Sequence, residues 1–181
     1  AIERIADAIP PVHTSDTIQK VIDRMVEFRL RHLPIVNEEQ FLGLVSENDL
    51  VEESDYQTPI GALALSLVNP YVLEDQHIYD VIRLFYELQL TVVPVLDVKK
   101  NYLGLIPINM MNEYFATLTS SSEPGGIIVL EISNNNNSLA HMAQIVESDN
   151  AQVLSSYVRT FPDSTNMDVT LKVNKVDISA I

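Results

Sequence analysis

The chain has 181 residues, of which 46% are hydrophobic and 20% are charged, a composition typical of a globular protein with a sizeable core. Its formal net charge of -14 argues against nucleic acid and acidic membranes as partners, because both attract clustered Lys and Arg. The absence of cysteine excludes disulfides and thiolate metal sites. No apolar run approaches the roughly 18 residues that cross a bilayer, so we expect a cytoplasmic protein.

The first predicted element is an amphipathic helix. Its apolar residues recur at spacings of three and four, at Ile18, Val21, Ile22, Met25 and Val26. Asp16 is the predicted N-cap of this helix, with Gln19 three residues later. Sixty positions further along, the same stripe returns at Ile78, Val81, Ile82, Phe85 and Tyr86. Asp75 or Gln76 is the predicted cap of this second helix.

Two predicted strands follow each helix. The first has an early proline and covers 33–36 and then 93–96, whereas the second contains a glycine and covers 41–45 and then 102–106. Each pair leads into a further predicted helix, starting near Asn48 and near Asn109, and each unit opens with a predicted strand that contains Val12 or Val72. The chain therefore contains a repeat of strand, helix, strand, strand and helix, and the two copies are expected to pack together.

A third predicted unit follows a linker at residues 119–125, where Ser, Pro and Gly dominate. Its elements are a strand at 127–132, a helix at 138–146, and strands at 153–158 and 167–173. The last five residues, 177–181, are predicted to begin another helix.

The two copies, residues 9–53 and 69–115, resemble the tandem CBS domain pair. The carriers of this resemblance are Leu33-Pro34-Ile35-Val36, Val93-Pro94-Val95-Leu96, the strands around Gly43 and Gly104, and the run from Gly43 to Leu50. The resemblance implies a mixed α+β or α/β fold in which two CBS-type βαββα repeats pack as a pair over residues 1–118. It also implies a non-catalytic regulatory module that binds adenosine-containing ligands in clefts between the repeats and forms a homodimer.

Residues 126–181 are similar to the ACT-type ligand-binding domain, which has a ferredoxin-like order of strand, helix, strand, strand, helix and strand. Asn135, Asn136 and Asn137 stand where that family has Asp, Pro and Gly, and Leu139 matches its leucine. The last helix and strand are absent, so we expect a βαββ unit that is either shortened or completed by a partner chain. A CBS pair with an ACT-like unit resembles the acetoin-utilisation protein B group, which implies regulation of carbon metabolism.

The asparagines at 134–137 have two interpretations. They could present amides to an amino-acid ligand, as the ACT resemblance implies, or they form only a polar turn that leads into an N-cap at Ser138. The sequence leaves both open.

The candidate ligand site lies at the junction of strand and helix in the first repeat. Ser46 and Asp49 match the hydroxyl and the ribose-binding carboxylate of the CBS family, and a carboxylate can accept hydrogen bonds from both ribose hydroxyls. Helix capping explains the same two residues equally well. The second repeat has Pro107 and Met110 at these positions, so we expect at most one nucleotide site per chain.

The resemblance implies further binding positions for adenine in the first repeat. These candidates are Pro11, Val12, His13, His32 and Pro34. Arg29, Arg31 and His32 form a basic island that could offset the repulsion of a phosphate, or they are a solvated surface cluster. Because the protein is acidic, AMP or an uncharged adenosine derivative is favoured over ATP, and S-adenosylmethionine is a further possible ligand.

Catalytic and metal-binding motifs are absent from the sequence. The four histidines show no paired spacing for a metal, and there is no glycine-rich phosphate loop, no G-x-S-x-G and no H-E-x-x-H. We therefore expect a protein that is not an enzyme and binds no metal. Two hypotheses remain: an adenosine-ligand sensor, and an interaction module whose degenerate clefts are filled by side chains.

Overall fold

The computed structural model describes residues 5–6, 8–65, 68–133 and 138–179. The chain divides into two compact units, Ala1–Met111 (unit 1) and Asn112–Ile181 (unit 2). Within the residues described, no helix is both long enough and apolar enough to cross a membrane.

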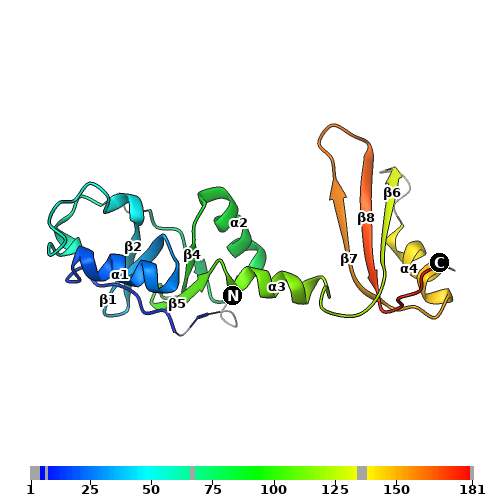
Figure 1. Cartoon of the computed structure of the whole chain (residues 1–181), viewed down its shortest axis with the longest axis horizontal. Helices are drawn as coiled ribbons and strands as arrows, with labels where there is room; N and C mark the ends of the chain where they lie inside the picture. Colours follow the sequence, from blue (N-terminus) through cyan, green and yellow to red (C-terminus); the bar gives the residue numbers. More distant parts are fainter. Residues whose placement is uncertain (1–4, 7, 66–67, 134–137, 180–181) are drawn as a thin grey trace. The chain divides into compact units, whose positions relative to one another are not determined.

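Unit 1 contains two similar sets of elements (Figure 1). The first set consists of α1 (Ile18–Phe28), β1 (His32–Asn37), β2 (Gln40–Ser46) and the short turns η2 (Glu47–Asp49) and η3 (Ile60–Ala62). The second set consists of β3 (Val72–Leu73), α2 (Ile78–Leu88), β4 (Val92–Leu96), β5 (Tyr102–Pro107) and the start of α3 (Met110–Leu118), which continues into unit 2. The predicted repeat and its mixed α+β fold are therefore confirmed.

The two long helices form where the apolar stripes predict them. In α1 the stripe buries Ile18, Val21 and Met25, whereas Val26, which the stripe also includes, is 71% exposed. In α2 the corresponding buried residues are Ile78, Val81 and Phe85. Each helix thus packs one face on the core of unit 1, as amphipathic helices do.

Both predicted helix caps were wrong by one or two residues. Thr17 caps α1, and its side chain accepts a hydrogen bond from the backbone N–H of Lys20. Asp16 is buried instead, because it accepts bonds from Lys20 Nζ and from the backbone N–H of His13. His77 caps α2 through Nδ1, which accepts from the backbone N–H of Tyr79.

The strands of each repeat form an antiparallel hairpin with a bulge. β1 pairs with β2, and the register shifts between Ile35 and Val36; β4 pairs with β5, and the register shifts between Val95 and Leu96. Opposite these bulges lie Gly43 at φ 151° and Gly104 at φ 157°. Residues with a side chain rarely adopt this backbone conformation. A preceding segment adds a parallel strand in each repeat: a bridge from Val12 to Ile35, and the pairing of β3 with β4.

The helix predicted near Asn48 is wrong, because the chain makes only the single turn η2 there. The following segment is rich in acidic and polar side chains that bond to nearby backbone, as Asp55 does with the N–H of Gln57. Such local bonds compete with a helix. The helix predicted near Asn109 does form, as α3.

After the rest of α3, unit 2 is a three-stranded antiparallel sheet with one helix. Its elements are β6 (Ile127–Ser133), α4 (Leu139–Ser148), β7 (Val153–Thr160) and β8 (Asn166–Val173), and the strand order is β6-β8-β7. The predicted strands and helix are confirmed, with Ser138 as the N-cap of α4. The asparagine run 134–137 lies outside the described residues. Residues 177–179 are not helical, so the helix predicted to start at Asp177 is not found there.

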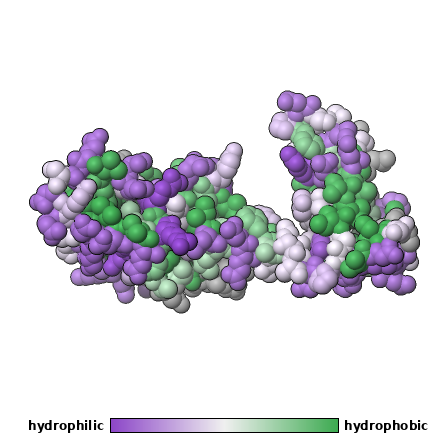
Figure 2. All heavy atoms as spheres, in the orientation of Figure 1, coloured by the Kyte–Doolittle hydropathy of each residue, from purple (hydrophilic) through white to green (hydrophobic). Residues whose placement is uncertain are grey.

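The core of unit 2 lies on one face of this sheet. It consists of Val146, Ala151, Val169, Leu171 and Val173, with Met142 and Ile178 packed against it. Ile127, Val129 and Tyr157 alternate with the inward-facing residues of their strands and are more than half exposed. Figure 2 shows hydrophobic atoms gathered on this unit between hydrophilic borders.

Candidate functional site

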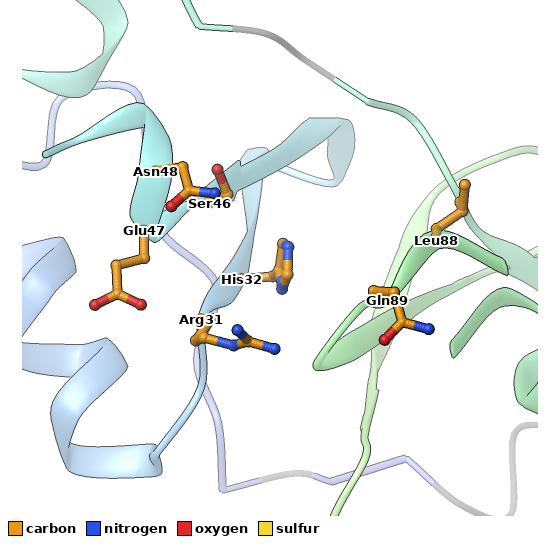
Figure 3. A pocket seen from close by; sticks show the side chains of 7 residues that line it. All are labelled: Arg31, His32, Ser46, Glu47, Asn48, Leu88 and Gln89. Atoms are coloured by element: carbon orange, nitrogen blue, oxygen red, sulfur yellow. The ribbon is translucent and has the colours of Figure 1, made fainter. Parts of the chain in front are cut away.

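Two pockets of unit 1 share His32, Ser46 and Leu88. The first, about 260 Å³, is lined by Arg31, His32, Ser46, Glu47, Asn48, Leu88 and Gln89, and we name it the polar pocket. The second, about 230 Å³, is lined by His32, Leu44, Ser46, Asp49, Val68, Leu88 and Leu90, and we name it the apolar pocket. Together they form a cleft that residues of both repeats line (Figure 3).

Ser46 and Asp49 form a capping box at the end of β2. The backbone N–H and the hydroxyl of Ser46 donate to Asp49 Oδ2, at 2.7 Å and 2.6 Å, and the backbone N–H of Asp49 donates to Ser46 Oγ at 3.3 Å. The capping interpretation therefore accounts for Asp49 Oδ2. Asp49 Oδ1 has no hydrogen bond to another described residue, so it can still accept one from a ligand.

The basic side chains of the polar pocket are those of Arg31, which directly precedes β1, and of His32, its first residue. Figure 3 shows Arg31 reaching toward Gln89, whereas Glu47 points away from it. Within the described part of the chain, Arg31 makes no ion pair through its guanidinium. A free cation at one end of a cleft can bind an anionic group of a ligand.

His32 lies between the two pockets and is half-buried. Burial lowers the pKa of His32 below 6.5, and the charge of Arg31 lowers it further, while the charge of Asp49 acts to raise it. The uncharged form of His32 is therefore favoured at neutral pH. Its Nδ1 lies 3.1 Å from Thr91 Oγ1, a residue of the second repeat.

The cleft brings together only some of the residues expected from the sequence. His32, Ser46 and Asp49 line it. The other four candidates, Pro11, Val12, His13 and Pro34, are absent from its lining. Val12 is fully buried against Ile35, and Pro34 pairs with Leu44 inside the hairpin.

Two of those four residues are occupied elsewhere in the first repeat. The carbonyl oxygen of Pro11 accepts a hydrogen bond from Arg24 Nη1 at 2.5 Å. His13 keeps an exposed side chain, and its Nδ1 lies 3.6 Å from Asp16 Oδ2. Of the predicted basic island, Arg31 and His32 line the cleft, but Arg29 does not.

Sequence reasoning missed the part of the cleft that the second repeat supplies. Leu88, Gln89 and Leu90, at the end of α2, form that side. The repeat itself contains the signal, because two similar units packed as a pair place the end of one helix beside the other unit. In the second repeat, the positions equivalent to His32, Ser46 and Asp49 hold apolar side chains. Val92 corresponds to His32 at an offset of sixty, and Pro107 and Met110 correspond to Ser46 and Asp49 at an offset of sixty-one.

Metal-binding groups do not gather anywhere in the part of the chain that the structure describes. No cluster of three or more His, Asp or Glu side chains is close enough to hold a metal ion there. The polar groups of the cleft, a guanidinium, an imidazole, a hydroxyl and a carboxylate, are instead suited to hydrogen bonding.

Known proteins resemble this chain in sequence locally and in fold more widely. Residues 3–56 match the family model described as the CBS domain. Among solved structures, a CBS domain pair/ACT domain protein from Thermotoga maritima is 23% identical, with a TM-score of 0.56 over 63% of this chain and 93% of that one.

Two further solved structures have the same fold. CBSX2, solved in complex with AMP, is 18% identical, with a TM-score of 0.53 over 63% of this chain and 93% of that one. The CBS domains of a transcriptional regulator from Streptococcus pneumoniae are 21% identical, with a TM-score of 0.53 over 61% of this chain and 92% of that one. At these identities the likeness establishes the fold of a CBS domain pair.

Proposed function

We propose that unit 1 is a non-catalytic sensor of an adenosine-containing ligand, because residues 3–56 match the CBS domain and the unit folds as a CBS domain pair. One ligand binds per chain, in the cleft that contains Ser46 and Asp49. Occupancy of the cleft alters how the two repeats contact each other, and a regulated partner reads that change.

The observation that carries this proposal is the cleft itself. Asp49 Oδ1 is available to a ribose hydroxyl, Leu44 and Leu90 offer an apolar wall to a base, and Arg31 lies in the polar pocket. A base, a sugar and a phosphate require these three environments in one connected space. CBSX2, a protein with the same fold, was solved in complex with AMP.

Among adenosine ligands, we propose AMP. Arg31 is the one lysine or arginine that lines the polar pocket within the described residues, and Glu47 lies at the same pocket. The chain as a whole has a net charge of -14. A triphosphate would bring more negative charge than one guanidinium offsets, so AMP is favoured over ATP. S-adenosylmethionine, which has no phosphate, is the comparison ligand.

Thermal denaturation in the presence of AMP, ADP, ATP and S-adenosylmethionine tests the proposal. A ligand at a hundredfold excess over its Kd stabilises the folded state by about 2.7 kcal/mol, which raises the Tm measurably. We expect the largest increase with AMP. No increase with any of the four would exclude an adenosine site in the cleft.

A second candidate function is an interaction module without a ligand. It is favoured by the second repeat, where Pro107 and Met110 provide neither a hydroxyl nor a carboxylate. It predicts an unchanged Tm with every nucleotide, so the same experiment separates the two functions.

For unit 2 we propose an ACT-like effector module. The strand order β6-β8-β7 with α4 as the crossover is that of a split βαβ unit, the first part of a ferredoxin-like fold. Homodimer formation, an amino-acid effector and a role in acetoin utilisation are parts of the same proposal. Size-exclusion chromatography with light scattering tests the homodimer, since a mass of one chain would exclude it.

A further inference from the structure

A side chain of the second repeat holds the imidazole that lies between the two pockets. The backbone N–H groups of Arg31 and His32 both donate to Thr91 Oγ1, each at 3.0 Å. Thr91 Oγ1 lies 3.1 Å from His32 Nδ1, and the backbone N–H of Thr91 donates to the same ring nitrogen at 3.3 Å. Thr91 is only 8% exposed, so water does not complete these bonds.

These four contacts determine which ring nitrogen of His32 has the proton. A hydroxyl has one proton and two lone pairs, and both lone pairs of Thr91 Oγ1 are used by the two backbone N–H groups. Its own proton is therefore left for His32 Nδ1, which also accepts from the N–H of Thr91. An acceptor of two hydrogen bonds cannot itself carry a proton, so the proton of neutral His32 is on Nε2.

The second ring nitrogen of His32 is left without a partner among the described residues. Nε2 of His32 makes no hydrogen bond to another described residue, and His32 lines both pockets. Its N–H is thus a free donor at the junction of the polar and apolar pockets, close to the end from which Arg31 extends (Figure 3). A donor there matches an acceptor of the ligand, such as a phosphate oxygen.

Only the first repeat has an imidazole at this position. Arg31 and Thr91 occupy equivalent positions, sixty residues apart, and the next residue is His32 in the first repeat but Val92 in the second. A valine cannot form the corresponding bridge. The first repeat therefore contains all three groups: the imidazole of His32, the hydroxyl of Ser46 and the carboxylate of Asp49.

We propose that Thr91 is a positioning residue which, from the second repeat, fixes His32 as a neutral Nε2–H donor to a phosphate oxygen of the ligand. This inference rests on the proposed function for its ligand, but the state of His32 can be measured without one. The cleft is then complete only while the two repeats are joined through Thr91, which links ligand binding to the contact between them.

Acid weakens this arrangement. Protonated Nδ1 would oppose the N–H and the hydroxyl proton of Thr91. The neighbouring charged groups are Arg31, which directly precedes β1, and Glu47 and Asp49 on η2. Leu88 and Gln89, on the opposite side, do not titrate. Because the folded-state pKa of His32 is lowered, its contribution to stability is complete above 6.5 and is lost as the pH falls through the lowered value.

The test is a long-range ¹H–¹⁵N spectrum of the imidazole nitrogens of the full chain, recorded without ligand across a pH titration. His32→Gln identifies the signals of His32 among the four histidines. We expect the Nε2–H tautomer and a pKa below 6.5. A predominant Nδ1–H tautomer, or a pKa at or above that value, would overturn the proposal in the wild-type protein itself.

Two variants of Thr91 test its role. Thr91→Val removes the hydroxyl at nearly constant volume, and we expect a mixture of tautomers, a higher His32 pKa and about tenfold weaker AMP binding, the loss typical of one hydrogen bond. Thr91→Ser retains the hydroxyl and should behave as the wild type. A Thr91→Val spectrum identical to the wild-type spectrum would contradict the positioning role.

The outcomes separate the two proposals. If wild-type protein shows the Nε2–H tautomer but binds no AMP, the proposed function fails and the placement of His32 stands. If AMP binds and depends on Asp49 but not on Thr91, the proposed function stands and the positioning role fails. If Thr91→Val does not fold, the wild-type and Thr91→Ser spectra still decide.

Discussion

Asp16 shows how one buried carboxylate stabilises the start of the first repeat. Its side chain is 8% exposed, and Oδ1 lies 2.6 Å from Lys20 Nζ. Burial acts to raise the pKa of Asp16, but the hydrogen bonds from Lys20 and from the backbone of His13 outweigh burial and lower it below 3.8. The folded state thus prefers the charged carboxylate.

Asp16→Asn should destabilise the protein by about 1 kcal/mol at neutral pH, because it removes one charge of a partly exposed pair. A folded-state pKa that is lowered contributes stability above 3.8 and loses it as the pH falls through the lowered value. The difference between variant and wild type should therefore shrink below 3.8, as measured by urea denaturation. Asp75→Asn, at an exposed position, is the control, and an equal loss there would contradict this role of Asp16.

The two carboxylate oxygens of Asp49 have different roles. Its Oδ2 completes the capping box with Ser46, and its Oδ1 faces no described hydrogen-bond donor. Asp49→Asn keeps an acceptor for the cap but removes the charge. We expect AMP affinity to fall about 10- to 100-fold in titration calorimetry, the range for a hydrogen bond to a charged group.

Asp55→Asn is the matched control for this variant. Asp55 accepts bonds from the N–H of Gln57 and the hydroxyl of Thr58 in a polar turn of the same repeat, away from the cleft lining. Equal losses of AMP affinity in both variants would assign the effect to charge in general rather than to Asp49.

At the scale of the elements, the hairpin bulges depend on glycine. Gly43 adopts φ 151° opposite the register shift of β1, a region that is essentially restricted to glycine. Gly43→Ala should destabilise the protein by about 1–3 kcal/mol in thermal or urea denaturation. Gln40→Ala, at an exposed position of the same strand, should change stability much less, and similar losses in the two variants would argue against strain at Gly43.

The sequence allowed most elements to be predicted, since the apolar period of each is distinct. The sixty-residue offset located both helices and both hairpins, and alternation located β8. Sequence reasoning failed where two adjacent polar residues could each cap the helix, as at Asp16 and Thr17, because propensity does not tell which of them is buried. It failed again after Asn48, where side-chain bonds such as those of Asp55 replace a helix.

At the scale of the whole molecule, the candidate cleft depends on contacts between sequence-distant segments. Ser46 and Asp49 could be found from their spacing, because that spacing is local. Leu88, Gln89 and Thr91 could not, since their position beside His32 follows from the packing of one repeat on the other. Pro11 and His13 were expected near adenine on resemblance alone, and neither lines the cleft.

The two repeats are similar in backbone and different in chemistry. The first repeat presents Arg31, His32 and Asp49 to the cleft, while Val92, Pro107 and their neighbours in the second repeat are apolar. The acidic character of the chain further disfavours ligands with several phosphates. The central claim is therefore one AMP site per chain.

Titration calorimetry of AMP into the full chain tests that claim most directly. We predict a stoichiometry of one AMP per chain, with binding that Asp49→Asn weakens and Asp55→Asn does not. Two AMP per chain would contradict the difference between the repeats, and no binding heat at several temperatures, together with an unchanged Tm, would contradict the nucleotide sensor and favour an interaction module.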